Sequence, residues 1–357
     1  MASRSNQTVS IKDVAKLAGV SISTVSRCLN EPERVKPKTL AAVQAAVEQT
    51  GYAPNALARN FRRGRTGLVM VVLQSVGLPF WGGVMNGINR VAQEEGYAIL
   101  IRETTHSPPE LDDYCRMVMS KEADGIIILA SPSPFSDTSA YSTGERRTPI
   151  VLGCEHVTDE LAHIPSVRVD NRRAAAEATQ YLWQLGHRRI AFITGARGSL
   201  LTRDRERGYR DTLTAQGHPP ASDWVVNGDQ SIEGARRATR KLLSLKARPT
   251  AIFCANDEMA MAAIHEIKRL GLRVPDDVSV VGFDDTRYAA IMDPPLTTVA
   301  QPTDEIGERT MRRLLNAIDG KDIGEGAEVV EHRLIVRGSS APPALTPQTK
   351  PLSTSDT

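Results

Sequence analysis

The chain has 357 residues, which suffice for two or three folded domains with a substantial buried core. Hydrophobic residues make up 41% of the chain and charged residues 24%, and these values exclude a collagen-like, wholly disordered or disulfide-scaffold protein. The apolar runs, such as residues 68–73 and 126–130, are too short to span a bilayer, so we expect no membrane segment.

Two further features indicate the compartment. Residues 1–10 are polar and lack the apolar stretch of a secretory signal. The four cysteines lie far apart and show no paired spacing: Cys28, Cys115, Cys154 and Cys254. We therefore expect a protein of the reducing cytoplasm.

Charge is distributed unevenly along the chain. The net charge is +2, but residues 1–66 hold eleven Lys or Arg against four Asp or Glu, which gives this segment about +7 and the remainder about −5. A basic segment suits a polyanion, because each cation near a phosphate releases condensed counterions. Charge alone does not identify that polyanion.

The basic segment predicts three short helices. Ser10 and Asp13 have the spacing of a capping box, and Gly19 is typical of the residue that ends a helix. Ser21 is a typical N-cap for a second helix, and Pro37 suits the first position of a third. The residues that we expect to face the core of these helices are apolar: Val14, Leu17, Ala18, Val25, Leu29, Leu40, Val43, Ala46 and Val47.

Two helices that meet across a tight A-G-V-S turn are typical of a helix-turn-helix, whose second helix places its first residues against base edges in the DNA major groove. Arg27 has the best chemistry for selecting a base, since its planar fork binds guanine O6 and N7 together, with about 1 to 3 kcal/mol of discrimination. Ile22 suits a thymine methyl group, and Ser23 suits either kind of base. The residues that we expect to contact phosphates and fix the register are polar: Ser10, Ser21, Thr24, Ser26, Asn30 and Asn55. From this pattern alone, a helical pair that only faces water fits equally well.

The run D-V-A-K-L-A-G-V-S-I-S-T-V-S-R-C-L-N, followed by G-Y-A-P-N-A-L-A-R-N-F, resembles the head of LacI-type (lactose repressor family) transcription regulators. The resemblance implies a DNA-binding head over residues 1–66, with a hinge helix at about 54–62 that folds on DNA. It places Phe61 where most members have a Leu that wedges into the minor groove and kinks the duplex. A linker role, in which Phe61 packs on the core, stays open. Lys36 departs from the capping Ser or Asp of the family, which predicts slight fraying at a cost of about 1 kcal/mol.

From Gly67 onward, apolar strands alternate with helical stretches, as in G-L-V-M-V-V-L, Y-A-I-L-I, D-G-I-I-I-L-A, R-R-I-A-F-I-T-G, T-A-I-F-C-A and V-S-V-V-G-F-D-D. This alternation predicts parallel sheets covered on both faces, and the number of strands exceeds one sheet, so we expect two doubly wound α/β subdomains. Ligands of such folds bind at the carboxyl ends of the strands. Beyond residue 340, the bias toward Pro, Ser and Thr predicts a disordered tail over residues 341–357.

The resemblance continues to Ser340 and implies a periplasmic-binding-protein-like core for effector binding and dimerisation, residues 67–340. Phrases that carry it include L-G-H-R-R-I-A-F-I-T-G, A-N-D-E-M-A and V-P-D-D-V-S-V-V-G-F-D-D. It implies that the chain crosses between the subdomains near Pro165, Pro294 and Ile323. The expected N-subdomain is about 67–165 and 296–322, and the C-subdomain about 166–295 and 323–340.

The family motifs assign hydroxyl groups of an effector to Arg205, Asn256 and Asp284, because an Arg donates twice and an Asp accepts twice. Phe80 and Trp81, which follow the first strand, are candidate stacking residues. Structural alternatives stay open for each: an ion pair between Arg205 and Asp284, a helix cap at Asn256, and a core position for Phe80.

The nature of the effector is less sharply indicated. Gln230 stands where sugar- and purine-binding relatives often have an aromatic ring, and Cys154 replaces an acidic or polar residue near the cleft. The stretches I-P-S-V-R-V-D-N and T-A-I-F-C resemble the cytidine repressor branch of the family. We therefore expect a nucleoside or a pentose-like sugar.

Catalytic and metal motifs are incomplete. H-E-I-K-R has Arg269 where a metalloprotease needs its second histidine, and the other six histidines show no ligand spacing. G-A-R-G-S-L at Gly195 has neither the Lys of a P-loop nor the third Gly of a dinucleotide fingerprint. We expect no enzyme activity, no cofactor and no metal.

These features together predict a homodimeric repressor whose two heads read a near-palindromic operator and whose affinity for DNA depends on a small molecule in the cleft. A solute-binding protein with the same core fold and an enzyme acting on a sugar or nucleoside are the alternatives. The first needs an export signal and the second a catalytic acid–base pair. Neither is evident in the sequence.

Overall fold

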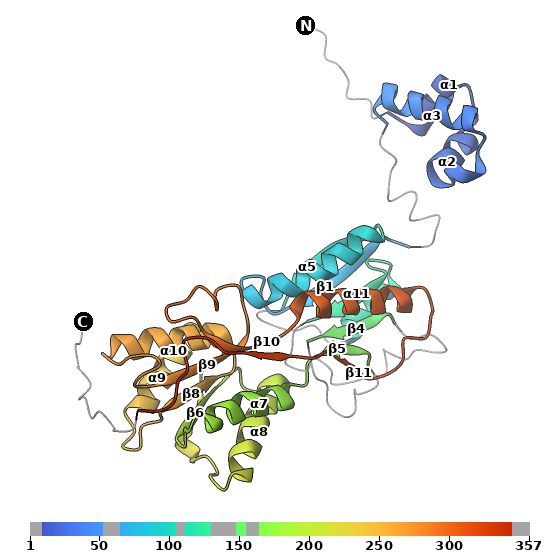
Figure 1. Ribbon diagram of the computed structural model, residues 1–357. Helices are drawn as coiled ribbons and strands as arrows, with labels where there is room; N and C mark the ends of the chain where they lie inside the picture. The colour runs from blue at the N-terminus through green and yellow to red at the C-terminus, as the bar shows by residue number, and fades with distance from the viewer. Residues whose placement is uncertain (1–8, 53–64, 105–110, 130–147, 155–163, 345–357) are drawn as a thin grey trace. The chain divides into compact units, whose positions relative to one another are not determined.

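The computed structural model describes residues 9–52, 65–104, 111–129, 148–154 and 164–344, and the chain divides into two compact units, residues 1–67 and 68–357. We call the first unit the head and the second the core. The described part of the head consists of α1 (Ile11–Ala18), α2 (Ile22–Asn30), a 3-10 turn (Pro32–Arg34) and α3 (Pro37–Thr50) (Figure 1). The three predicted helices are confirmed.

The ends of the head helices follow from their sequence. Ser10 and Asp13 form the predicted capping box, in which the Ser10 N–H donates to the Asp13 carboxylate over 2.9 Å. Gly19 and Gly51 end α1 and α3 in the left-handed conformation, with φ of 64° and 66°. The side chain of Lys36 does not cap α3, as the sequence predicts.

The hydrophobic interior of the head is small and is formed by one face of each helix. Val14, Val25 and Val43 are almost completely buried. The expectation that Leu17 faces this core is wrong, because its side chain is 47% exposed. Three helical residues advance by about 300°, so Leu17 lies roughly 60° around α1 from Val14 and reaches the edge of the packed face.

The first lobe of the core is built on a six-stranded sheet with the strand order β11-β5-β4-β3-β1-β2, and all its neighbouring strands are parallel. Its elements are β1 (Leu68–Leu73), α5 (Pro79–Glu94), β2 (Ala98–Glu103), α6 (Leu111–Met119), β3 (Gly125–Ile128), β4 (Ile150–Gly153), β5 (Ser166–Arg168), α11 (Thr303–Ile318) and β11 (Ala327–Val329).

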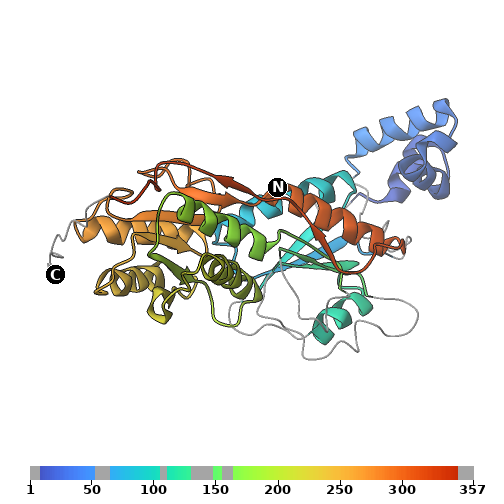
Figure 2. The same ribbon diagram turned by 60° about the horizontal axis from the view of Figure 1, so that its bottom comes forward.

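Alternation along the central strand explains why helices cover both faces of this sheet. Val69 and Val71 belong to the cluster under α5 and α11, whereas Met70 and Val72 belong to the cluster that includes Tyr114 of α6. Figure 2 shows α6 on one side of the sheet and α5 and α11 on the other.

Two helices of the first lobe approach each other closely. A Cβ placed on Gly307 of α11 would lie 2.0 Å from the backbone oxygen of Val84 in α5, so only glycine fits at this crossing. The helix that begins beside the cleft, α5, is thereby packed backbone to backbone against α11.

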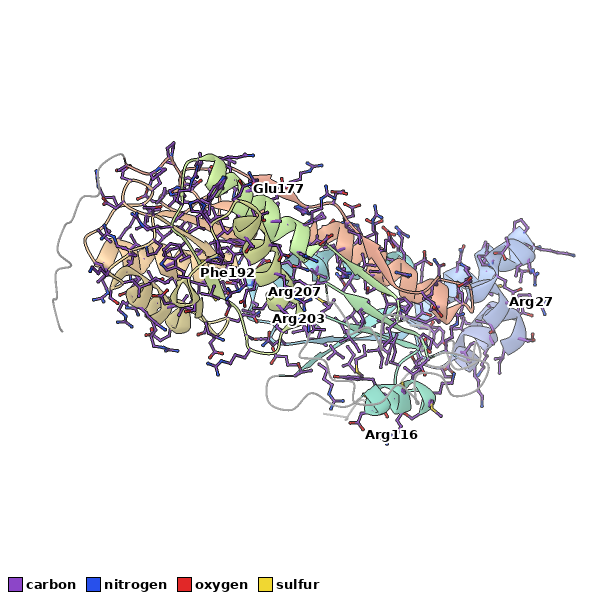
Figure 3. The ribbon with its side chains drawn as sticks, turned by 90° about the horizontal axis from the view of Figure 1, so that it is seen from below. Arg27, Arg116, Glu177, Phe192, Arg203 and Arg207 are labelled. Atoms are coloured by element: carbon purple, nitrogen blue, oxygen red, sulfur yellow. The ribbon has the colours of Figure 1, made fainter. Side chains whose placement is uncertain are left out.

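The second lobe has a six-stranded sheet with the order β12-β10-β9-β8-β6-β7, parallel except for the antiparallel pair of β10 and β12. Two helices, α9 and α10, cover one face, and α7 and α8 cover the other (Figure 1). Its elements are α7 (Asn171–Gln184), β6 (Ile190–Thr194), α8 (Leu200–Ala215), a 3-10 turn (Ser222–Trp224), β7 (Val225–Asn227), α9 (Ile232–Leu243), β8 (Ala251–Cys254), α10 (Asp257–Arg269), β9 (Ser279–Asp284), β10 (Thr297–Ala300) and β12 (Arg333–Ile335). The buried centre includes Phe192 of β6 (Figure 3). The two doubly wound sheets predicted from the sequence are confirmed.

The subdomain boundaries predicted from the sequence are wrong at three places. β5 pairs in the first sheet although it follows Pro165, β10 pairs in the second sheet although it follows Pro294, and β11 pairs in the first sheet although it follows Ile323. The carbonyl of Pro165 still accepts a hydrogen bond from Leu152 of β4, because a proline at the start of a strand loses only its own donor. The chain crosses after each of these strands: between β5 and α7, between β10 and α11, and between β11 and β12.

The end of the described chain is held in the second lobe. The buried ring of His187 lies 2.9 Å from the Ala341 carbonyl through Nε2 and 2.9 Å from the Thr250 hydroxyl through Nδ1. The Ser279 hydroxyl also donates to that carbonyl, over 3.0 Å. The prediction that a disordered tail starts at residue 341 is therefore wrong for Ala341, and residues 345–357 of that prediction lie outside the described part of the chain.

Candidate functional sites

The start of α2 presents the polar face predicted to meet DNA. The Ser21 Oγ accepts a hydrogen bond from the Thr24 N–H over 3.1 Å and lies 2.7 Å from the Ser23 Oγ. Ile22 is 44% exposed, and Ser23 and Arg27 are exposed as well (Figure 3). The structure thus brings the three predicted base-contacting side chains together at the surface of one helix.

The predicted phosphate contacts are placed less uniformly. The Ser10 hydroxyl donates to the Asp13 carboxylate over 2.7 Å, so in the free head it is occupied by the capping box. Thr24 and Ser26 are half-buried on α2. Asn30 is the last residue of α2, and the placement of its side chain is not described. Asn55, Phe61 and the predicted hinge helix at 54–62 lie outside the described residues.

The core contains a cleft of about 730 Å³, counting its solvent-open mouth, whose walls come from both lobes. It lies beyond the carboxyl ends of β1, β6, β8 and β9 and at the starts of α5, α8 and α10, where the sequence predicts it. The cleft is lined by Gln74, Leu78, Pro79, Phe80, Trp81, Gly195, Ser199, Leu201, Thr202, Arg205, Gln230, Ala255, Asn256, Glu258, Met259, Asp284 and Thr286. All five predicted effector contacts belong to this set.

Arg205 of α8 is anchored by the second lobe. Its Nε donates to the Asn171 Oδ1 over 2.8 Å, and its Nη1 donates to the Ala255 carbonyl over 2.5 Å. The guanidinium also lies flat on Phe283, with its carbon 3.6 Å from the ring centroid. The side chain is 9% exposed, so this cation is fixed in position at the wall of the cleft.

Asp284 ends β9 and faces Arg205. Its Oδ1 lies 3.9 Å from the Arg205 Nη1 and accepts a hydrogen bond from the Gln301 Nε2 over 2.7 Å. Burial raises the pKa of Asp284, and the Arg205 guanidinium only partly opposes that rise. Its φ of 116° is strained for a residue with a side chain, which is typical of functional sites. The ion pair that the sequence left open as a structural alternative therefore forms, at the long end of its range.

A second carboxylate lies beneath the cleft. Asp257 is fully buried at the start of α10 and accepts hydrogen bonds from the Thr286 N–H (2.7 Å) and hydroxyl (3.1 Å) and from the Thr298 hydroxyl (2.6 Å). Burial raises the pKa of Asp257, and these donors partly offset that effect. Asp257 thus ties α10 to β10 and to the loop after β9.

Asn256 forms the helix cap that the sequence offered as the structural alternative, and its position leaves the predicted effector contact open. Its Oδ1 accepts a hydrogen bond from the Met259 N–H over 2.8 Å, which makes it the N-cap of α10. The residue also lines the cleft. The cap fixes the orientation of the side chain at the wall of the cleft.

The aromatic wall comes from the first turn of α5. Phe80 and Trp81 pack edge to face, with ring centroids 4.9 Å apart. Phe80 is half-buried and Trp81 is 6% exposed, and both line the cleft. The Trp81 Nε1 is buried and has no hydrogen-bond partner among the described residues.

Sequence reasoning missed Glu258 and Gln301. Glu258 follows the A-N-D motif directly, so the position of that motif beside the cleft was the available signal. Gln301 stands at the crossing from β10 to α11, where the sequence placed no crossing. Gln230 lines the cleft as expected, with a left-handed φ of 50°, whereas Cys154 is buried and is not among the described lining residues.

Groups of three or more His, Cys, Asp or Glu side chains that can hold a metal ion are absent from the part of the chain that the structure describes. Among the described helices, none is long and apolar enough to cross a membrane.

The chain is similar to known proteins along most of its length. Residues 10–55 match the family model described as bacterial regulatory proteins, lacI family, and residues 179–340 match that of a periplasmic binding protein-like domain. The HTH-type transcriptional repressor CytR of Escherichia coli (strain K12) is 35% identical over 339 residues, which cover 95% of this chain and 98% of that protein. Catabolite control protein A of Priestia megaterium is 32% identical over 93% of this chain and 99% of its own length.

Solved structures have the same architecture. The lac repressor dimer bound to operator and the anti-inducer ONPF superposes with a TM-score of 0.82 at 29% identity, over 94% of this chain and 100% of that one. The transcriptional regulator CelR in complex with cellobiose has a TM-score of 0.69 at 30% identity, over 93% of this chain and 100% of that one.

Proposed function

The chain belongs to the lacI family of bacterial regulatory proteins, and we propose that it represses transcription by binding a near-palindromic operator under the control of a small effector. One observation carries this proposal: the same chain combines an exposed recognition helix with a cleft whose walls come from two lobes. The regulatory role and the family fold agree with the relatives, which are named as repressors and regulators. We propose no catalytic step.

The DNA is bound through the head. Arg27 selects a base in each half-site, with Ile22 and Ser23 beside it, and the capped start of α2 holds these side chains in place. Ser10, Ser21, Thr24, Ser26, Asn30 and Asn55 contact phosphates, and Phe61 wedges into the minor groove between half-sites. Because a near-palindrome has twofold symmetry, the operator is read by a homodimer.

The effector is a nucleoside or a pentose-like sugar held by Arg205, Asn256 and Asp284, with Phe80 and Trp81 as the apolar wall. A solved relative named as a cellobiose complex and a relative named as the repressor CytR support ligands of this kind. An effector that contacts both lobes binds their open and closed arrangements unequally. This inequality shifts the equilibrium between the arrangements and changes the affinity for operator.

A solute-binding protein and a sugar-acting enzyme are the two alternatives to a repressor. A solute-binding protein of the same core fold has no use for a recognition helix, and the basic head argues for a cytoplasmic regulator. An enzyme acting on a sugar needs one side chain that donates a proton and one that accepts a proton at the reacting bond. Among the described residues of the cleft, Asp284 is already engaged by Gln301 and faces Arg205, an arrangement that binds hydroxyl groups.

The test is fluorescence anisotropy of the full-length chain with labelled duplexes from its own upstream region, at several salt concentrations, with and without cytidine, adenosine and ribose. We expect binding that falls linearly with salt on logarithmic axes, and at least about a fivefold change of affinity with one effector. Failure to retain any duplex in a salt-dependent manner, with or without these compounds, contradicts the proposal.

A further inference from the structure

The cleft contains a carboxylate that neither the DNA-binding role nor the hydroxyl contacts use. Glu258 is half-buried in the first turn of α10 and lines the cleft. Burial raises its pKa, and no described residue forms a hydrogen bond or an ion pair with it. A half-buried carboxylate keeps part of its hydration, so a molecule that displaces this water from the cleft must supply hydrogen-bond donors in its place.

Among the lining residues that the structure describes, no free cation balances the charge of Glu258. The charged residues of the lining are one guanidinium, Arg205, and two carboxylates, Glu258 and Asp284. Arg205 donates to Asn171 and to a backbone carbonyl, lies on the ring of Phe283 and faces Asp284, so these groups already stabilise its charge. Burial raises the pKa of Asp284 and favours its neutral form. Among the described lining residues, Glu258 is therefore the carboxylate that no cation faces.

The opposite wall offers a hydrogen-bond donor. The indole Nε1 of Trp81 is buried at the start of α5 without a partner in the described structure, which leaves a donor to be satisfied. A hydroxyl group accepts from an indole N–H and donates to a carboxylate, so one hydroxyl-bearing molecule can satisfy both walls. This donor and Glu258 lie on different lobes of the same cleft.

We propose that the cleft selects its effector by charge: it binds neutral or cationic molecules that carry hydroxyl groups, it rejects their phosphate esters, and Glu258 sets this selectivity. The inference rests on the proposed function, because it concerns the effector of the same cleft. The cleft of about 730 Å³ has the volume of a sphere about 11 Å across, which is comparable with the Debye length of about 8 Å at physiological salt. The repulsion between the Glu258 carboxylate and a phosphate bound beside it is therefore only partly screened.

A purely structural role for Glu258 makes a different prediction. A carboxylate in the first turn of α10 is favoured by the helix dipole, and Asp257 precedes it there. If this were its only role, replacing Glu258 by Gln would change stability but leave the relative affinities of neutral and phosphorylated ligands unchanged.

The experiment is isothermal titration calorimetry of the full-length chain with four matched pairs: cytidine and cytidine 5′-monophosphate, adenosine and adenosine 5′-monophosphate, ribose and ribose 5-phosphate, glucose and glucose 6-phosphate. It compares the wild type with Glu258→Gln and with the control variant Glu95→Gln. Glu95 is an exposed residue at the C-terminal end of α5, whereas the cleft residues of α5 lie in its first turn. Circular dichroism checks that both variants are folded.

We expect the wild type and Glu95→Gln to bind a neutral compound at least about tenfold more tightly than its phosphate ester, and Glu258→Gln to narrow this ratio to within about threefold. A phosphate ester that binds the wild type as tightly as its parent compound overturns the proposal, even if Glu258→Gln does not fold. An unchanged ratio in folded Glu258→Gln overturns the role of this residue.

The proposed function and the charge rule fail in distinguishable ways. If glucose binds, glucose 6-phosphate does not, and no nucleoside or pentose binds, the charge rule is supported and the proposed effector class is overturned. If no compound of the panel binds, both the charge rule and the effector class are overturned, whereas operator binding is judged separately by anisotropy.

Discussion

Replacing Asp257 by Asn tests how the floor of the cleft is held together. The three hydrogen bonds to this buried carboxylate come from the Thr286 N–H, the Thr286 hydroxyl and the Thr298 hydroxyl. An Asn can keep all three contacts if its oxygen faces Thr286 and its amide N–H faces Thr298, because that hydroxyl can rotate to accept. The substitution therefore removes the charge and leaves the network intact.

The sign of the pH effect follows from burial. Because burial raises the pKa of Asp257 above its ordinary value near 4, the folded chain holds this proton more tightly than the unfolded chain. Stability from this group is fully present below about pH 4 and is lost as the pH rises through the raised pKa. Each unit of that rise lowers the free energy of unfolding at neutral pH by about 1.4 kcal/mol.

We therefore compare the free energy of unfolding of Asp257→Asn with that of wild type at two pH values. We expect the difference, variant minus wild type, to be at least about 1.4 kcal/mol more favourable to the variant at pH 8 than at pH 4.5. Asp257→Ala leaves the buried Thr286 N–H unpaired and costs about 2 to 4 kcal/mol at pH 4.5, and because it also removes the carboxyl group its cost relative to wild type is smaller at pH 8. Urea unfolding followed by tryptophan fluorescence measures this, because the three tryptophans, Trp81, Trp183 and Trp224, all lie in the core.

Asp293→Asn is the matched control, because the side chain of Asp293 is 98% exposed. We expect its stability relative to wild type to be nearly independent of pH. A difference between Asp257→Asn and wild type that is the same at pH 4.5 and pH 8 refutes the reasoning, as does a wild type that gains stability over the variant with rising pH.

Three further predictions concern other parts of the chain. Gly307→Ala places a methyl group against the α5 backbone and costs at least about 2 kcal/mol, whereas Gly82→Ala, with nothing within 4 Å, changes stability by less than about 1 kcal/mol; thermal unfolding compares them. Burial lowers the pKa of His187 to about 4, so the stability contributed by the neutral ring is present above about pH 6.5 and is lost as the pH falls through about 4. We expect His187→Gln to weaken the loss of stability at acid pH, measured by urea unfolding. The same dependence of unfolding free energy on pH in the variant and in wild type contradicts this prediction. Arg27→Ala relaxes base selection at one position of each half-site by about 1 to 3 kcal/mol in competition with mutated operators, and a uniform loss on all duplexes argues against a base contact.

The head was predictable because its determinants are local. Ser10 with Asp13, Ser21 and Gly19 each fix a helix end through residues three or four positions away. The position of Leu17 was not predictable in this way, because its exposure depends on where α1 rests on α3. Neither a propensity nor a cap records that angle.

The core was predictable as an alternation of strands and helices but not as a division into lobes. Sheet membership of the short strands β5, β10 and β11 depends on partners far away in the sequence, such as β9 for β10. Prolines near these strands mark local constraints on the backbone, and they do not record which sheet the next strand joins. For the same reason Gln301, which lies at a crossing, was not predicted as a site residue.

The crossings also explain how a small molecule can act on the arrangement of the lobes. Gln301 donates to Asp284 of the second lobe, and the chain then continues directly into α11 of the first. The aromatic wall of Phe80 and Trp81 belongs to α5, which is packed against α11, while Glu258 and Asp284 belong to the second lobe. A rotation of one lobe on the other therefore moves the indole donor relative to the Glu258 carboxylate. Because a ligand spanning both walls is satisfied in only one such arrangement, its binding energy differs between them, and that difference is what control of operator affinity requires.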